Sequence, residues 1–142
     1  MKTISPESDF FKEINYKVIA AIGGLSDQTT NEKVINIFDN YTNTEKNLTR
    51  VRLSTVVFES KKSGREVYQC YVTLYLHGSD VNYRTDIITN FLKAGLADDI
   101  FLKFGFRLGD ISKFRDASRN LGRGNVEDRS SFSLSLIYEI FA

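Results

Sequence analysis

The stretch that decides the fold is residues 126–141, V-E-D-R-S-S-F-S-L-S-L-I-Y-E-I-F, just before the final Ala142. From Phe132 to Ile140 every second residue is apolar, and the residues between them are mostly serine or glutamate. This period of two predicts a strand with one buried and one polar face. An unpaired strand with so much apolar surface would invite association, so we expect it to be paired within the sheet of its own domain.

Two further long strands precede it. Residues 51–59 are rich in Val, Leu and Thr, and residues 67–77 are rich in Tyr, Val and Leu. The charged segment between them, residues 60–66, contains Gly64, which tolerates the positive φ that hairpin turns need. We therefore predict a hairpin. Shorter strands are predicted at residues 34–38 and 106–111.

Helical signals flank these strands. Ser5 and Pro6 are typical of an N-cap and a first helical residue, and apolar residues then recur at helical spacing as far as Ile22. Gly23-Gly24 is expected to end this helix. Asp80 is expected to cap a second helix, with an apolar stripe ending at Leu92, and residues 96–104 to add a further helical turn or two.

The resulting order is α-β-β-β-α-β-β, without internal repeats or a linker. Residues 39–49 and 112–125 are polar and are expected to be loops. We predict a single α+β domain covering residues 1–142. Its mostly antiparallel sheet has about four to five strands and packs against two or three helices.

Composition excludes several functional classes. The chain has 142 residues, a formal net charge of +1, one histidine and one cysteine. The charge gives no basic field for wholesale binding of nucleic acid or an anionic membrane. A single cysteine excludes an intrachain disulfide and fits a reducing compartment. We find no secretion signal and no membrane-spanning run in the sequence.

Candidate catalytic residues are few. His77 is expected to be a partly exposed residue at a strand end, and Cys70 a buried apolar residue. The segment Gly122-Arg123-Gly124 begins like a dinucleotide fingerprint, but it lacks the third glycine and precedes a strand, so a loop is expected. We predict no catalytic, metal or cofactor site and no enzymatic activity.

Charged and aromatic residues instead indicate contacts with other molecules. Lys61, Lys62 and Arg65 lie at the predicted hairpin tip, and Tyr71 and Tyr75 share the strand face opposite Cys70. That face is expected to meet a ring lumen, a helix or a neighbouring subunit. Basic residues also gather in the late polar segment. The candidate assembly contacts are Lys61, Lys62, Arg65, Tyr71, Tyr75, Arg115, Arg119 and Arg123.

The order of these segments resembles the bacteriophage tail terminator, or neck terminator, family. The resemblance covers roughly residues 30–142. It rests on an early apolar strand with a polar turn, a hairpin, a long strand ending at a glycine before the main helix, a short strand with its loop, and a charged entry to the final strand. The segments that carry it are residues 34–40, 51–54, 67–80, 110–114 and 127–134. The chain departs from the family in having no proline at residues 39–49.

This resemblance implies a virion structural protein assembled in the host cytoplasm. It implies a ring, usually of six subunits, that caps the finished tail tube and docks the head-side connector, with sheath as a further partner if the tail contracts. Genome DNA would pass through the lumen without specific recognition. No catalytic residue, cofactor or membrane is implied.

Two alternatives remain at this stage. The first is another neck, head-closure or tail-completion protein of similar topology. The second, from a different class, is a small nucleic-acid-binding module that uses Arg115, Arg119 and Arg123, and it predicts a steeply salt-dependent affinity for DNA.

Overall fold

The final strand lies inside the sheet and is paired on both sides. In the computed structural model the backbone is described for residues 2–40, 47–112, 115–116, 119–122, 125–127 and 129–141, and side chains for 2–40, 47–112 and 130–141. All thirteen residues of β9 (Arg129–Phe141) pair with β4 (Arg65–Gly78), and β5 (Phe106–Ile111) pairs with its other side. The prediction that this strand pairs within its own sheet is confirmed.

Seven of the described strands form one sheet, in the order β1-β3-β4-β9-β5 with β2 on β3 and β6 on β9. The pairing of β2 with β3 is parallel, and every other pairing in the sheet is antiparallel. The prediction of a single α+β domain with a mostly antiparallel sheet is confirmed, although the sheet has more strands than expected. The remaining strands of this sheet are β1 (Lys2–Thr3), β2 (Lys33–Asn36), β3 (Asn47–Lys62) and β6 (Arg115–Asp116).

The hairpin between β3 and β4 is tighter than the sequence indicated. Only Ser63 and Gly64 separate the two strands, and both have positive φ, 51° and 75°. A two-residue turn with positive φ at both positions matches the right-handed twist of the strands. The predicted seven-residue charged turn is therefore wrong, because most of it extends the strands.

Helix α1 (Asp9–Gln28) begins and ends later than predicted. Its N-cap is Ser8, whose Oγ accepts a hydrogen bond from the Phe11 backbone N–H at 3.2 Å, and not Ser5. Gly23 and Gly24 do not end the helix. A Cβ atom at Gly24 would lie 3.0 Å from Ile100 Cγ2, so this glycine allows α1 and α3 to approach closely.

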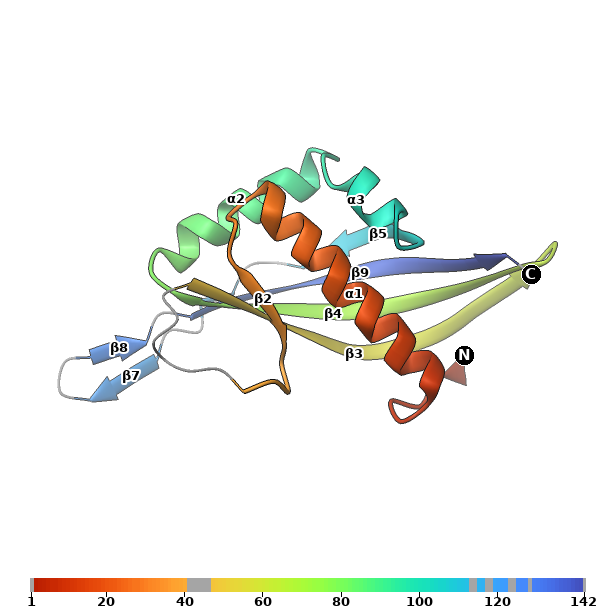
Figure 1. Ribbon diagram of the computed structural model, residues 1–142, viewed down its shortest axis with the longest axis horizontal. Helices are drawn as coiled ribbons and strands as arrows, with labels where there is room; N and C mark the ends of the chain where they lie inside the picture. Colours follow the sequence, from red (N-terminus) through yellow and green to blue (C-terminus); the bar gives the residue numbers. More distant parts are fainter. Residues whose placement is uncertain are drawn as a thin grey trace.

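Helices α2 (Val81–Lys93) and α3 (Asp98–Leu102) lie with α1 on one face of the sheet (Figure 1). Asp80 is the N-cap of α2, as predicted, but it has a left-handed backbone and its side chain makes no capping hydrogen bond. The core lies between these helices and the sheet. Its largest fully buried side chains are Phe101, Phe106, Phe132, Ile14, Ile22, Leu25, Leu48, Leu74, Leu76, Leu92, Leu136 and Val18.

A second, smaller hairpin projects beyond the body of the sheet (Figure 1). It consists of β7 (Arg119–Gly122) and β8 (Asn125–Glu127), which pair only with each other among the described strands. The prediction of a loop over residues 112–125 is therefore wrong for the described parts of that segment. We call this hairpin the arm.

A buried ion pair fastens the end of the sheet nearest α2. Arg84 of α2 donates from Nε to Glu32 Oε2 at 2.8 Å, and a second hydrogen bond from Nη2 reaches the same oxygen. Arg84 Nη1 also donates to the carbonyl oxygens of His77 and Ser79 at 3.0 and 2.9 Å. The connection to α2 thus folds over the strand end. His77 is only 7% exposed, so the prediction of partial exposure is wrong.

Replacing Arg84 with Ala is expected to lower the free energy of unfolding by about 3–5 kcal/mol, because Glu32 would remain buried without its partner. Urea denaturation followed by circular dichroism measures the change. The matched control is Arg52→Ala at an exposed position of β3, with an expected effect within about 0.5 kcal/mol. Equal effects of the two substitutions would contradict a stabilising role of the ion pair.

Candidate assembly surface

The sheet face opposite the helices is uncovered over much of its area. Tyr71, Thr73 and Tyr75 point to this open face, while Cys70 and its alternate neighbours are buried under the helices. Tyr71 is 44% exposed. Of the three expected neighbours of this face, a helix of the same chain is excluded within the described residues (Figure 1).

Short hydroxyl side chains lie beside these residues on the open face. Tyr71 and Thr73 lie opposite Ser135 and Ser133 of β9, and Tyr75 lies opposite Ser131. The hydroxyls of Thr73 and Ser133 are 2.9 Å apart and hydrogen-bonded. Tyr71 donates from its hydroxyl to Gln69 Oε1 at 3.0 Å. The β4 and β9 residues at the centre of the open face thus carry hydroxyl and amide side chains joined by hydrogen bonds, while Arg50 and Arg52 of β3 lie on the same face, opposite Tyr75 and Thr73.

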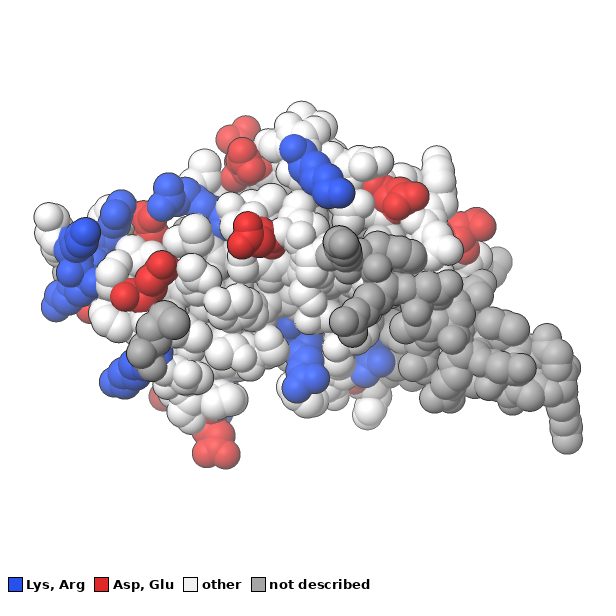
Figure 2. Space-filling model, turned by 180° about the vertical axis from the view of Figure 1, so that it is seen from behind, with Lys and Arg blue, Asp and Glu red and all other residues white. Residues whose placement is uncertain are grey.

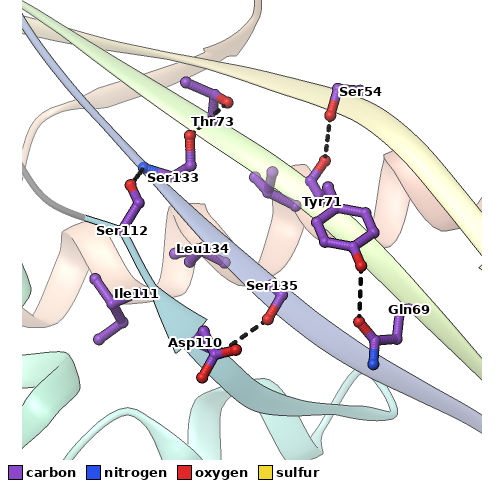
Figure 3. Close-up of a pocket in the computed structure, with 11 residues that line it drawn as sticks. Ser54, Gln69, Tyr71, Thr73, Asp110, Ile111, Ser112, Ser133, Leu134 and Ser135 are labelled. Carbon is purple, nitrogen blue, oxygen red and sulfur yellow. Dashed lines mark hydrogen bonds between the residues drawn. The ribbon is translucent and has the colours of Figure 1, made fainter.

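A cavity of about 350 Å³ lies on this face between β4 and β5, with β9 as its floor (Figure 3). Ser135 Oγ accepts a hydrogen bond from the Asp110 backbone N–H at 2.8 Å, and Ser112 Oγ accepts one from Ser133 N–H at 2.6 Å. These bonds join the wall to the floor. The described residues that line the cavity are Ser54, Gln69, Tyr71, Val72, Thr73, Asp110, Ile111, Ser112, Ser133, Leu134 and Ser135.

The cavity depends on an irregularity in β5 that we did not predict. The register shifts between Leu108 and Ile111, so that β5 bulges against β9. Gly109 lies within this bulge, where an added Cβ would collide with Ser135. The sequence did contain a signal for this bulge, namely a glycine inside a predicted strand. An isolated glycine in a strand often marks a bulge or a close backbone approach. Among the described residues that line the cavity there is no arginine or lysine.

The β3–β4 hairpin tip carries the first predicted basic group. Lys61 and Lys62 are exposed at the end of β3, and Arg65 begins β4. Arg65 Nη1 lies 3.5 Å from Glu139 Oε2, and Arg107 pairs with the same carboxylate. Figure 2 shows basic side chains gathered at this end of the molecule. Both lysines are thus exposed, and the paired Arg65 side chain is itself 43% exposed.

The second predicted basic group lies at the other end of the sheet. Arg115 is in β6 opposite Ser131, and Arg119 is in β7 opposite Glu127. Arg123 lies outside the described residues. The structure therefore separates the candidate contacts into a hairpin tip, an open face and an arm, and does not bring them into one site.

The remaining candidates for chemistry are buried. Cys70 is fully buried, as predicted, and burial raises the pKa of its thiol to about 12. The described residues contain no group of three or more His, Cys, Asp or Glu side chains placed to hold a metal ion. No helix in the described part of the chain is long and apolar enough to span a bilayer.

Comparison with protein-family models and with curated proteins finds no match for this sequence.

Cys70 is expected to resist iodoacetamide in the folded protein at pH 8 and to react fully in urea, because the buried thiol stays protonated. Mass spectrometry measures the labelling. The raised pKa also has a consequence for stability. The unfolded thiol ionises near its ordinary pKa of 9.0, so stability is lost as the pH rises from there toward about 12. Rapid labelling of the native protein would contradict this assignment.

Proposed function

We propose that this chain is a phage tail terminator. In this role six copies form a ring that caps the tail tube, ends its elongation and docks the head-side connector. The observation that carries the proposal is the combination of a one-sided sheet with projections at both ends. The resemblance in element order over residues 30–142 supports the same function.

A ring requires two different surfaces on each subunit, related by a rotation that closes. The hairpin tip and the arm lie at opposite ends of the long sheet (Figure 1), and each extends beyond the helical layer. An isolated two-stranded ribbon is marginally stable in water. Contact with a neighbouring subunit, with tube protein or with the connector would stabilise the arm, which pairs with no other described strand.

The open face suits a surface past which DNA moves. The hydroxyl side chains of β4 and β9 provide hydration along its centre, and the arginines that could hold phosphate groups, Arg50 and Arg52, lie beside them on β3. The described residues of the cavity lining include Asp110 and no basic side chain. In this proposal the open face lines the ring lumen or lies against a neighbouring subunit, and the genome passes without specific recognition.

The nucleic-acid-binding alternative rests on the arm. A two-stranded β-ribbon fits the major groove of DNA, and Arg119 belongs to this ribbon. That function predicts binding that weakens steeply with salt. The terminator proposal predicts no such binding by the isolated chain.

The deciding experiment combines the purified protein with tail-tube protein from the same genome. Light scattering and negative-stain microscopy are expected to show rings at tube ends and tubes that stop growing. Rings without tube protein would also support the proposal. A protein that does not bind the tubes would contradict the proposal and favour another neck protein. A salt-sensitive shift of DNA would favour the nucleic-acid-binding module.

Replacing Tyr75 with Ala is expected to reduce ring or cap formation at least about tenfold, because tyrosine is a frequent anchor of protein interfaces. The change should affect thermal unfolding much less, since this side chain lies on the open face. Tyr16→Ala is the matched control, because Tyr16 is 77% exposed on α1, away from this face. Assembly at wild-type levels would exclude the open face around Tyr75 from the interface.

A further inference from the structure

Phe38 is the most exposed large apolar side chain in the described part of the chain. It is 82% exposed and lies in the turn that follows β2, beyond the strand in which the sequence placed it. Scattered apolar residues on a surface are common and by themselves have no consequence. This one differs because the turn that carries it is held in place.

Several hydrogen bonds fix the turn. Asn36 Oδ1 accepts from the Phe38 backbone N–H at 3.3 Å, and the Asp39 N–H donates to the Asn36 carbonyl at 2.9 Å. The Ile37 N–H donates to the Val51 carbonyl at 2.9 Å, and Arg50 Nη2 donates to the Ile37 carbonyl at 2.8 Å. The phenyl ring is thus presented on a backbone that loses little freedom when it is buried.

The opposite edge of the sheet has a cavity of matching size. It measures about 240 Å³ and lies between α3 and β5. Leu102, Phe106 and Leu108 provide its apolar wall, and Leu102 is 57% exposed. A cavity of about 150 Å³ already holds a benzene molecule. A phenyl group therefore fits this space.

Charge also favours this pairing. Asp39 follows Phe38 directly, and Arg107 lies on the rim of the cavity. Arg50 lies beside the Phe38 turn, and Asp98 lies on the same rim. Each side therefore carries one basic and one acidic residue, although Arg107 also pairs with Glu139 and Arg50 with the Ile37 carbonyl. Opposite potentials across an interface favour one register over others.

The two features cannot meet within one chain. The Phe38 turn follows β2 at one edge of the sheet, and β5 forms the other edge (Figure 1). Because they lie at opposite edges of the sheet, two copies related by a twofold axis cannot form both contacts between them at once. A projection on one edge that fits a cavity on the other gives a head-to-tail contact, which closes into a ring when the rotation permits.

We propose that Phe38 of one copy enters the α3–β5 cavity of the next copy. This inference rests on the ring assembly proposed above and assigns its subunit contact. In this contact each subunit inserts its Phe38 into one neighbour and receives Phe38 of the other neighbour in its cavity. Every subunit of a closed ring is therefore equivalent. It also covers Leu102, which is otherwise exposed next to the free edge of β5.

A disulfide cross-link tests the contact directly. In the double variant Phe38→Cys, Leu102→Cys, mild oxidation of the full chain is expected to give a ladder of covalent multimers up to the ring. The natural Cys70 is fully buried and will not interfere. The matched control is Tyr16→Cys, Leu102→Cys, which places an equally exposed thiol on α1 and is expected to give no ladder. Absence of the ladder from the first variant at high protein concentration would overturn the proposal.

Complementation tests the head-to-tail arrangement. Phe38→Ala retains the cavity and Leu102→Glu retains the phenyl group, so each alone is expected to associate about 30-fold more weakly than wild type. Their equimolar mixture is expected to form one-to-one dimers that grow no further, because only one intact contact can form between them. Sedimentation velocity measures the sizes, and circular dichroism verifies that both variants fold.

The outcomes separate this contact from the proposed function. If Phe38→Ala forms full rings with wild-type affinity, the subunits must use another interface. The proposed tube-capping function would not be contradicted by that result. If the double variant gives a cross-linked ladder but the protein does not bind tube protein, the Phe38 contact would be supported and the terminator function contradicted.

Discussion

The register between β4 and β9 is the constraint on which the rest of the structure depends. Thirteen consecutive pairs place Cys70 opposite Leu136 and Tyr71 opposite Ser135, so that apolar residues share one face and hydroxyls the other. A slip of one residue would move every side chain of β9 to the wrong face. Helices pack only where the apolar face lies, and the other face stays open because serine, threonine and tyrosine occupy its centre on β4 and β9. Both layers of the domain follow from this pairing.

The alternation of apolar and polar residues along the long strands made this two-layer arrangement predictable. Strands β4, β5 and β9 and helix α2 were found from local patterns, because in each the burial of one face repeats at the period of the element. The predictions that were wrong concern residues whose surroundings are set by contacts distant in the sequence. Gly24 was expected to end a helix, but its missing Cβ instead admits Ile100, a residue of α3. His77 was expected near solvent, yet Arg84 brings the start of α2 over it. Such contacts carry no local signal.

The candidate assembly surface was predictable only as a set of residue types. The sequence placed Tyr71 and Tyr75 on the face opposite Cys70, and that face is open. It did not indicate the cavity, because the bulge at Gly109 and the hydrogen bonds of Ser112 and Ser135 depend on the pairing of β5 with β9. It also placed Phe38 within a strand. The turn that exposes this ring is set by Asn36 and by the parallel pairing of β2, which the alternation does not encode.

The two edges of the sheet differ in a way that limits how copies associate. The β3 edge is covered in part by β1 and β2, whereas β5 has no partner on its outer side among the described strands. A free edge invites strand addition, which has no natural end. Strand β5 is short and bulged, and both features hinder regular backbone pairing with another chain. In the contact that we propose, association at this edge relies on a side chain that fits a shaped cavity. Such a contact fixes the angle between neighbours, and a fixed angle is what a closed ring needs and an open-ended sheet lacks.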